Sequence, residues 1–150
     1  MSTFLISVVS VIVAVSIIVT VHEFGHFIVA RWLGVKVLRF TVGFGKPLLK
    51  HVSAKSKVEY VLATGPMGGY VKMLDEREGE VHPSEQALAF NRQSLSSRIA
   101  IVAAGPLFNF IFAVFAYACM YLVGVQGIVP EIGKVEKDSI AYEAGLNRGD

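Results

Sequence analysis

Charged side chains are scarce in this sequence, and their scarcity excludes a typical soluble domain. Only 17% of the 150 residues are charged, whereas 53% are hydrophobic and the mean hydropathy is +0.56. No Lys, Arg, Asp or Glu precedes Glu23, and none lies in residues 99–130. Each of these two stretches is long enough to cross about 30 Å of hydrocarbon. We therefore expect an integral membrane protein.

Cysteine is also nearly absent. The one cysteine, Cys119, lies inside the second apolar stretch, which excludes an internal disulfide framework and a cysteine-rich metal site. The first apolar stretch has no basic segment before it and no small-residue cleavage site at its end. It is also longer than the apolar core of a signal peptide, which is roughly 7–15 residues. We expect it to be retained as a membrane helix.

Basic residues are concentrated between the two apolar stretches. Residues 31–98 carry eleven Lys or Arg against six acids, which gives +5, whereas residues 1–30 carry −1 and residues 99–150 carry −2. The positive-inside rule places residues 31–98 in the cytoplasm and both ends of the sequence outside. Because these charges flank two membrane spans and are mixed with acids, we expect a lipid bilayer and no nucleic acid as a partner.

The sequence predicts a membrane α-helical protein with a small β insert. Two transmembrane helices are joined by a cytoplasmic β-rich loop and an amphipathic helix, and the start of a further domain follows. The expected segments are residues 1–30 for the first transmembrane helix, 31–83 for the β-rich loop, 84–98 for the amphipathic interfacial helix, 99–127 for the second transmembrane helix and 128–150 for the start of the further domain.

Shorter elements are predicted within two of these segments. Runs of apolar and β-branched residues bounded by glycines indicate strands in the loop. The predicted strands are residues 35–42, 57–64 and 70–74, with a fourth at residues 132–135. Residues 139–144 favour a short helix, with Ser139 as its N-cap and Gly145 just after its end.

His22, Glu23 and His26 form the pattern HExxH. Two residues four apart on a helix lie on one face, so both imidazoles can reach one zinc ion while Glu23 faces a water beside the metal. Zinc at that position would make the water more acidic and polarise a carbonyl, and Glu23 would act as the base. A chance match is the alternative, because only three positions of the pattern are fixed.

The position of this pattern inside an apolar stretch favours the catalytic interpretation. Counting back from Arg31 at about 1.5 Å per residue places both histidines below the inner membrane interface. Ionisable groups at that depth are energetically unfavourable and usually mark a functional site. Gly25, between the two histidines, would let another helix approach closely.

Several separated motifs together resemble the site-2 protease family of intramembrane zinc metalloproteases. These motifs are VHEFGHFIVAR around the HExxH pattern, the GFG of Gly43, Phe44 and Gly45, GPMGGYVKMLDE at residues 65–76, the FN of Phe90 and Asn91, and AAGPLFNF at residues 103–110. The resemblance implies a protease of the bacterial inner membrane that cleaves transmembrane segments of membrane-anchored substrates, such as anti-sigma factors, in regulated intramembrane proteolysis. It implies zinc as the cofactor, His22 and His26 as its ligands and Glu23 as the catalytic base.

The resemblance also suggests residues that bind the substrate. One segment is similar to the family's membrane-reentrant β-loop, whose edge strand would pair with an unwound substrate. This segment consists of Gly68, Gly69, Tyr70, Val71, Lys72 and Met73, and an ordinary hairpin is the alternative. The GFG segment is similar to a family loop near the site or, alternatively, forms a tight turn. Asn109 either positions the catalytic helix or makes an ordinary interhelical contact.

A third zinc ligand is not evident. The family supplies it as the Asp of a Leu-Asp-Gly motif on a later transmembrane helix, and this sequence has no such motif. We therefore expect remaining C-terminal spans to provide it, and we expect these 150 residues alone to be inactive. Residues 128–150 resemble the start of an outward-facing PDZ domain.

Two other hypotheses are considered for the function. A non-catalytic membrane protein of the same fold that binds substrates is the main alternative to a protease. A membrane-tethered soluble zincin is disfavoured, because HExxH precedes the first basic flank instead of following it.

Overall fold

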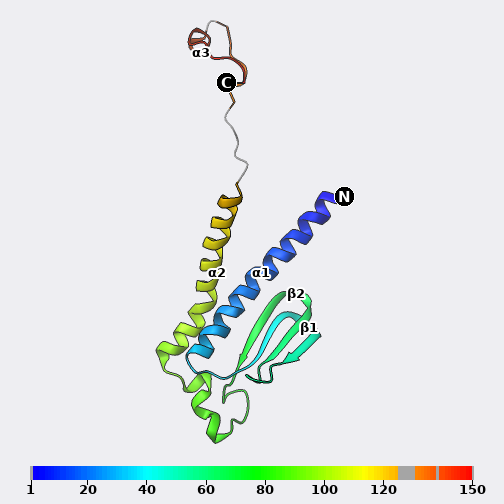
Figure 1. Ribbon diagram of the computed structural model, residues 1–150, viewed down its shortest axis with the longest axis vertical. Helices are drawn as coiled ribbons and strands as arrows, with labels where there is room; N and C mark the ends of the chain where they lie inside the picture. The colour runs from blue at the N-terminus through cyan, green and yellow to red at the C-terminus, as the bar shows by residue number, and fades with distance from the viewer. Residues whose placement is uncertain (1, 125–130, 138, 150) are drawn as a thin grey trace. The chain divides into compact units, whose positions relative to one another are not determined.

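The computed structural model describes residues 2–124, 131–137 and 139–149, except for the side chains of residues 66 and 67. Its elements in order are α1 (Ser2–Trp32), β1 (Val37–Val52), β2 (Glu59–Met73), the 3-10 helices η1 (Pro83–Leu88) and η2 (Phe90–Arg92), α2 (Leu95–Val123) and α3 (Ile140–Glu143) (Figure 1). Residues up to Ala116 form one compact unit, and residues from Tyr117 onward form a second.

The two predicted apolar helices are present, and both are long and apolar enough to cross a membrane. α1 has 31 residues and α2 has 29. α2 begins at Leu95, four residues before the prediction, because the Ser94 hydroxyl accepts the N–H of Ser97 at 3.2 Å and caps the helix. The helix ends at Val123, and residues 125–127 of the predicted span lie outside the described residues.

A small antiparallel sheet follows α1. β1 pairs with β2, and both strands bend back, so that each contributes two arms to the sheet. The register places the arms in the order 69–73, 37–42, 59–63 and 47–52. The arm formed by residues 69–73, which we call the edge arm, therefore has a β1 neighbour on one side only.

The first strand is much longer than the sequence predicts. The prediction ended it at residue 42, whereas β1 runs on through the GFG segment to Val52. Gly43 and Gly45 have positive φ angles of 87° and 96°, a conformation that glycine adopts readily. In the structure these glycines accompany shifts of register, as in β-bulges, and the strand continues past them. The GFG segment therefore lies at the bend between the two arms of β1, where the chain reverses direction without leaving the strand.

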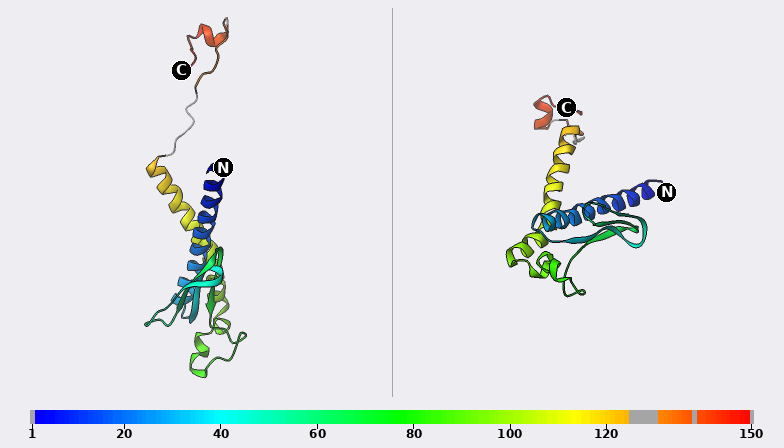
Figure 2. Two further views of the ribbon diagram at one scale, coloured as in Figure 1. Left: turned by 90° about the vertical axis from the view of Figure 1, so that its right-hand side faces the viewer. Right: turned by 60° about the horizontal axis from the view of Figure 1, so that its bottom comes forward.

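The sheet packs against the C-terminal half of α1, as the views in Figures 1 and 2 show. The ring of Phe27 lies 5.2 Å from that of Phe40 and 6.1 Å from that of Tyr60. The buried core consists of Phe27, Ala30, Val35, Val37, Val58 and Ile101. Because this core joins α1, the sheet and α2, burial of apolar surface holds the edge arm in a fixed position beside both helices.

The amphipathic helix predicted over residues 84–98 is not formed. The structure has the short helices η1 and η2 in its place, and the backbone is extended at Ala89 and Gln93. The Phe90 N–H donates to the carbonyl of Leu74 at 2.7 Å, and the Lys36 N–H donates to the carbonyl of Leu88 at 3.0 Å. These bonds to distant residues replace the local bonds that an α-helix needs.

The second unit agrees only partly with the prediction. Residues 131–136 have no regular secondary structure, so the strand predicted at 132–135 is not formed. The Ile132 carbonyl accepts the Gly149 N–H at 2.9 Å instead of a bond from a neighbouring strand. The predicted short helix is α3, where the Ser139 hydroxyl accepts the Tyr142 N–H at 3.2 Å. Residues 128–130 of the expected PDZ segment lie outside the described residues.

Candidate metal centre

His22 and His26 present their imidazole rings to each other from successive turns of α1. Their Nε2 atoms are 3.1 Å apart, and the ring planes meet at 81°. Two nitrogens that share one tetrahedral zinc at about 2.0–2.1 Å lie about 3.3 Å apart. The observed separation therefore fits two ligands of a single zinc ion.

The other ring nitrogen of each histidine contacts α2. Nδ1 of His26 lies 2.7 Å from the carbonyl oxygen of Ile101. A carbonyl only accepts, so Nδ1 donates a proton and Nε2 keeps its lone pair for a metal. Nδ1 of His22 lies 3.2 Å from the side-chain amide of Asn109. The structure places the amide nitrogen at this contact and leaves the buried amide oxygen without a partner. Turning the amide over would bring its oxygen to Nδ1, where it would accept the proton and select the same tautomer.

Gly105 of α2 leaves the space beside the two histidines open. A Cβ atom at this position would lie 2.4 Å from Nε2 of His26 and 2.6 Å from Nε2 of His22, closer than real Cβ atoms approach. A zinc ion would bind the same two nitrogens at about 2.0–2.1 Å. The cradle that glycine leaves therefore fits the metal that HExxH predicts.

Gly105 was not identified from the sequence as a functional residue. Its only signal was its place in the AAGPLFNF motif, because a glycine in an apolar helix ordinarily indicates helix packing. Gly25 has that packing role, as predicted. A Cβ there would lie 2.6 Å from the carbonyl oxygen of Ala104, so α1 and α2 touch at the level of the histidines.

Glu23 faces a cavity of about 680 Å³ that lies between the helices and the edge arm. His26 lines the same cavity, whose remaining wall comes from the edge arm, the loop after it and α2. Those other lining residues are Tyr70, Val71, Lys72, Met73, Asp75, Arg77, Glu78, Phe90, Ile101 and Val102. The acid–base candidate, one histidine and the edge arm therefore share one space.

The predicted substrate-binding residues separate into two groups. Tyr70, Val71, Lys72 and Met73 line the cavity, and Gly69 lies beside Glu23, because a Cβ on Gly69 would be 3.2 Å from the Glu23 Cγ. Gly68 packs instead under the ring of Phe44, and Gly43 packs against the carbonyl oxygen of Gly65. In the described part of the chain, neither Gly68 nor the GFG residues Gly43, Phe44 and Gly45 line that cavity.

Charged groups gather along one part of the cavity wall. Arg39 donates to the Tyr70 hydroxyl at 3.0 Å and lowers the pKa of this phenol. Arg77 donates two hydrogen bonds to Asp75 and lowers the pKa of that carboxyl. Glu78 forms an ion pair with Lys72 at 3.4 Å. The loop after β2 therefore adds paired charges to the cavity wall.

A third protein ligand does not join the two histidines. Over residues 2–124, 131–137 and 139–149, no group of three His, Cys, Asp or Glu side chains is arranged to hold a metal ion. A zinc ion in a catalytic site usually has three protein ligands and one open position. Among the described residues, the histidine pair could therefore supply two of these three ligands.

Comparison with known proteins gives a consistent result. Residues 10–144 match the family described as Peptidase family M50. The chain is 51% identical over 149 residues to the regulator of sigma-E protease RseP of Escherichia coli, and 50% identical over 149 residues to a Vibrio cholerae protein named "Putative zinc metalloprotease". It is 47% identical to Protease RseP of Yersinia pestis, again over 149 residues. Each alignment covers 99% of this chain and 33% of the relative, so the chain spans about a third of the length of these curated relatives.

Proposed function

This chain belongs to peptidase family M50, the site-2 protease family, and from that premise we propose that it carries the first part of an intramembrane zinc endopeptidase site. The observation that carries the proposal is the arrangement of the His22 and His26 Nε2 atoms, 3.1 Å apart beside the space that Gly105 leaves open. Soluble zinc peptidases use the same pair of ligands one helical turn apart. Here the pair lies on a helix apolar enough to span a membrane.

Three side chains of α1 divide the chemistry between them. His22 and His26 hold the metal, and zinc bound there would supply a Lewis acid that polarises a peptide carbonyl. Glu23 takes a proton from the attacking water and delivers it to the leaving amine. The shared cavity of Glu23 and His26 supports this division, because a peptide bond in that cavity would lie within reach of both side chains.

The edge arm provides the place where the substrate backbone is held. A transmembrane helix hides its carbonyls in its own hydrogen bonds, so the substrate must unwind before it is cleaved. An unwound segment can add as a further strand along residues 69–73, whose second side has no β1 neighbour. The contribution of Tyr70, Val71 and Lys72 to the cavity wall supports this path.

The rest of the protein completes the site. We propose that later transmembrane spans supply an aspartate as the third zinc ligand. Two observations support this: the chain covers about a third of the length of its relatives, and its described residues offer only the two histidines as ligands. The proposed location is the bacterial inner membrane, with residues 31–98 in the cytoplasm and the N-terminus outside. The proposed substrates are membrane-anchored proteins such as anti-sigma factors. Residues 128–150 are proposed to begin a PDZ domain.

Metal analysis of histidine variants tests this proposal. The protein, expressed at the length of its relatives, is purified in detergent as His22→Ala, His26→Ala and, as a control, His51→Ala. His51 is exposed on the sheet, so its variant should keep one zinc per chain. Either α1 variant should lose zinc, because one imidazole and one further ligand hold it poorly. Full zinc content in both α1 variants would contradict the proposal.

A further inference from the structure

The turn between β1 and β2 carries exposed positive charge with no compensating acid. Lys55 and Lys57 are both exposed, and residues 50–58 contain no Asp or Glu. Lys50, just before the turn, forms an ion pair with Glu59, which also pairs with Arg39. Among the ion pairs of the described residues, none includes Lys55 or Lys57. Two free ammonium groups therefore project from this turn.

Lys57 occupies a backbone conformation that does not favour lysine. Its φ angle is 57°, and it is the one non-glycine residue with positive φ among the described residues. The turn closes through a bond from the Lys57 N–H to the Ser53 carbonyl at 2.9 Å and from the Ser53 N–H to the Val58 carbonyl at 3.0 Å. Glycine or asparagine is the usual residue in this conformation, so lysine is an uncommon choice here.

The turn is held at the level where α1 ends. Val58, the next residue, is 2% exposed and belongs to the same core cluster as Ala30 and Val35, which flank the end of α1. Trp32, the last residue of α1, is 73% exposed and follows Arg31. An exposed Trp beside a basic residue at the end of an apolar helix is typical of the membrane–water interface.

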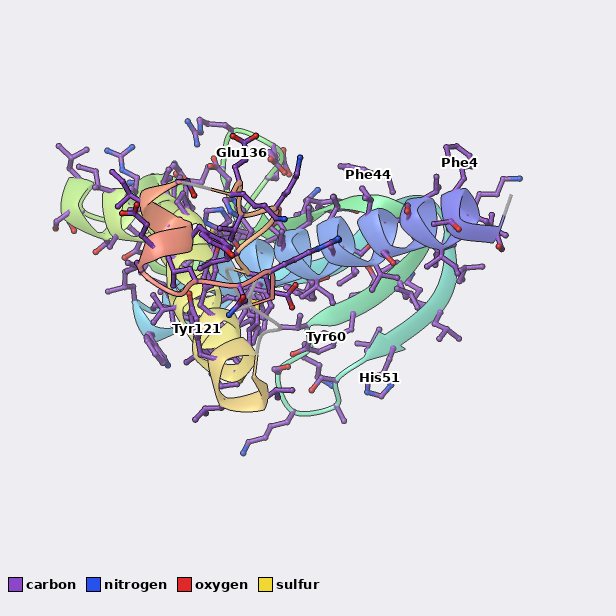
Figure 3. All side chains as sticks on the ribbon, turned by 90° about the horizontal axis from the view of Figure 1, so that it is seen from above. Phe4, Phe44, His51, Tyr60, Tyr121 and Glu136 are labelled. Carbon is purple, nitrogen blue, oxygen red and sulfur yellow. The ribbon has the colours of Figure 1, made fainter. Side chains whose placement is uncertain are left out.

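The sheet around this turn has the other properties of a membrane surface. The turn lies between the two arms of the sheet farthest from the edge arm, and Figure 3 shows His51 on the outermost arm. Leu48, Leu49 and Val52 of that arm are 61%, 67% and 53% exposed. Along this arm and the turn, exposed apolar side chains come first and the unpaired lysines follow. In a bilayer, the acyl chains would contact the apolar side chains and the headgroups would contact the lysines.

We propose that Lys55 and Lys57 bind the phosphates of anionic phospholipids in the cytoplasmic leaflet. The lysines anchor the outer end of the sheet at the headgroup level, and because the sheet packs as one body on α1, this contact sets the depth of the edge arm. Ammonium groups on flexible stems suit phosphates whose positions vary. The inference needs α1 to span the membrane but does not depend on zinc or on catalysis.

Quenching of a label in the turn tests this contact. The chain carries Cys119→Ala and Ala54→Cys, and a fluorophore on residue 54 is exposed to an aqueous quencher. Vesicles contain either phosphatidylcholine alone or phosphatidylcholine with phosphatidylglycerol. Phosphatidylglycerol should shield the label, and high salt should remove the shielding. Replacement of both lysines by Lys55→Gln and Lys57→Gly should lower the equilibrium constant for contact about 25-fold, at roughly fivefold per lysine.

The matched control removes the same charge elsewhere. The control variant, Lys134→Gln with Lys137→Gln, should leave the shielding intact. The test variant should fold, because Lys57→Gly puts the residue that prefers a positive φ angle into the turn. Equal quenching in the two vesicle types would overturn the proposal, as would equal losses in the test and control variants. Two further results would also overturn it. If inorganic phosphate shields the label in phosphatidylcholine vesicles, the lysines bind a free anion. If only added polyglutamate shields it, they bind an acidic protein.

Discussion

At the level of single residues, the proposed metal centre depends on the absence of a side chain at Gly105. We expect Gly105→Ala to reduce zinc occupancy at least about tenfold, because its Cβ would lie 2.4–2.6 Å from both Nε2 atoms and occupy the position of the ion. Zinc per purified chain is the measurement. Gly133→Ala serves as the control, since a Cβ there meets no atom within 4 Å. Normal zinc content in Gly105→Ala would show that the metal lies elsewhere.

The sequence indicated the groups that we propose react, but not the groups that surround them. HExxH predicted His22, Glu23 and His26 because the spacing of a helix fixes their mutual positions. Asn109 was a candidate for positioning the catalytic helix because it is a polar residue in an apolar span. The structure places its side-chain amide 3.2 Å from Nδ1 of His22. Gly105 could not be identified in this way, because its role depends on which residues face it across two helices that lie far apart in the sequence.

At the level of elements, the edge arm makes a prediction about the substrate. We expect Val71→Pro or Lys72→Pro to reduce cleavage of a transmembrane substrate, because proline removes an N–H that could pair with the added strand. Which of the two matters depends on which N–H faces the substrate. Zinc content should remain normal, which separates substrate binding from metal binding. Leu48→Pro, on the opposite side of the sheet, is the matched control. Unchanged cleavage in both edge-arm variants would exclude strand addition at this edge.

The loop after the edge arm is predicted to respond to acid. Glu76 accepts hydrogen bonds from Arg92 and Asn91, and these two side chains lower its pKa. Since the folded pKa is below the unfolded one, the stabilisation is present above about pH 4 and is lost as the pH falls through the lowered value. Amide hydrogen exchange in residues 74–80, corrected for intrinsic rates, should accelerate over that range. Glu76→Gln should remove this dependence, and an unchanged response in Glu76→Gln would assign it to another group.

Element boundaries were harder to predict than the elements themselves. Long charge-free stretches indicated both helices, because few other structures accommodate so many apolar residues. The extension of β1 past Gly43 and the loss of the helix at 84–98 were not predictable in the same way. Both depend on hydrogen bonds to distant residues, such as the bond from the Phe90 N–H to the Leu74 carbonyl. A local sequence pattern contains no information about such bonds.

At the level of the whole molecule, the charge distribution predicts the orientation. Single cysteines at Ser56 and Ser139, in a Cys119→Ala background, should react with a membrane-impermeant thiol reagent from opposite sides of the membrane. Ser56 lies in the basic segment and should be cytoplasmic, whereas Ser139 lies beyond α2. Reaction of both cysteines from the same side would show that one apolar helix does not cross.

In the proposed function the active site is divided along the protein, and for that reason we expect the chain alone to be inactive. Two imidazoles leave zinc short of one protein ligand, and the described residues offer no third. The cavity beside Glu23 also requires a far wall to hold the substrate at attack distance. Both requirements are met, in our account, by the part of the protein that the relatives possess and this chain does not cover.

The most direct test of the account is the effect of Glu23→Gln on cleavage and on zinc in the same preparation. The protein at the length of its relatives is reconstituted with a membrane-anchored substrate, and product and zinc are both measured. We predict that Glu23→Gln keeps zinc and abolishes detectable cleavage, because the ligands remain and the base is removed. Cleavage by Glu23→Gln at the rate of the natural sequence would contradict the assignment of this site.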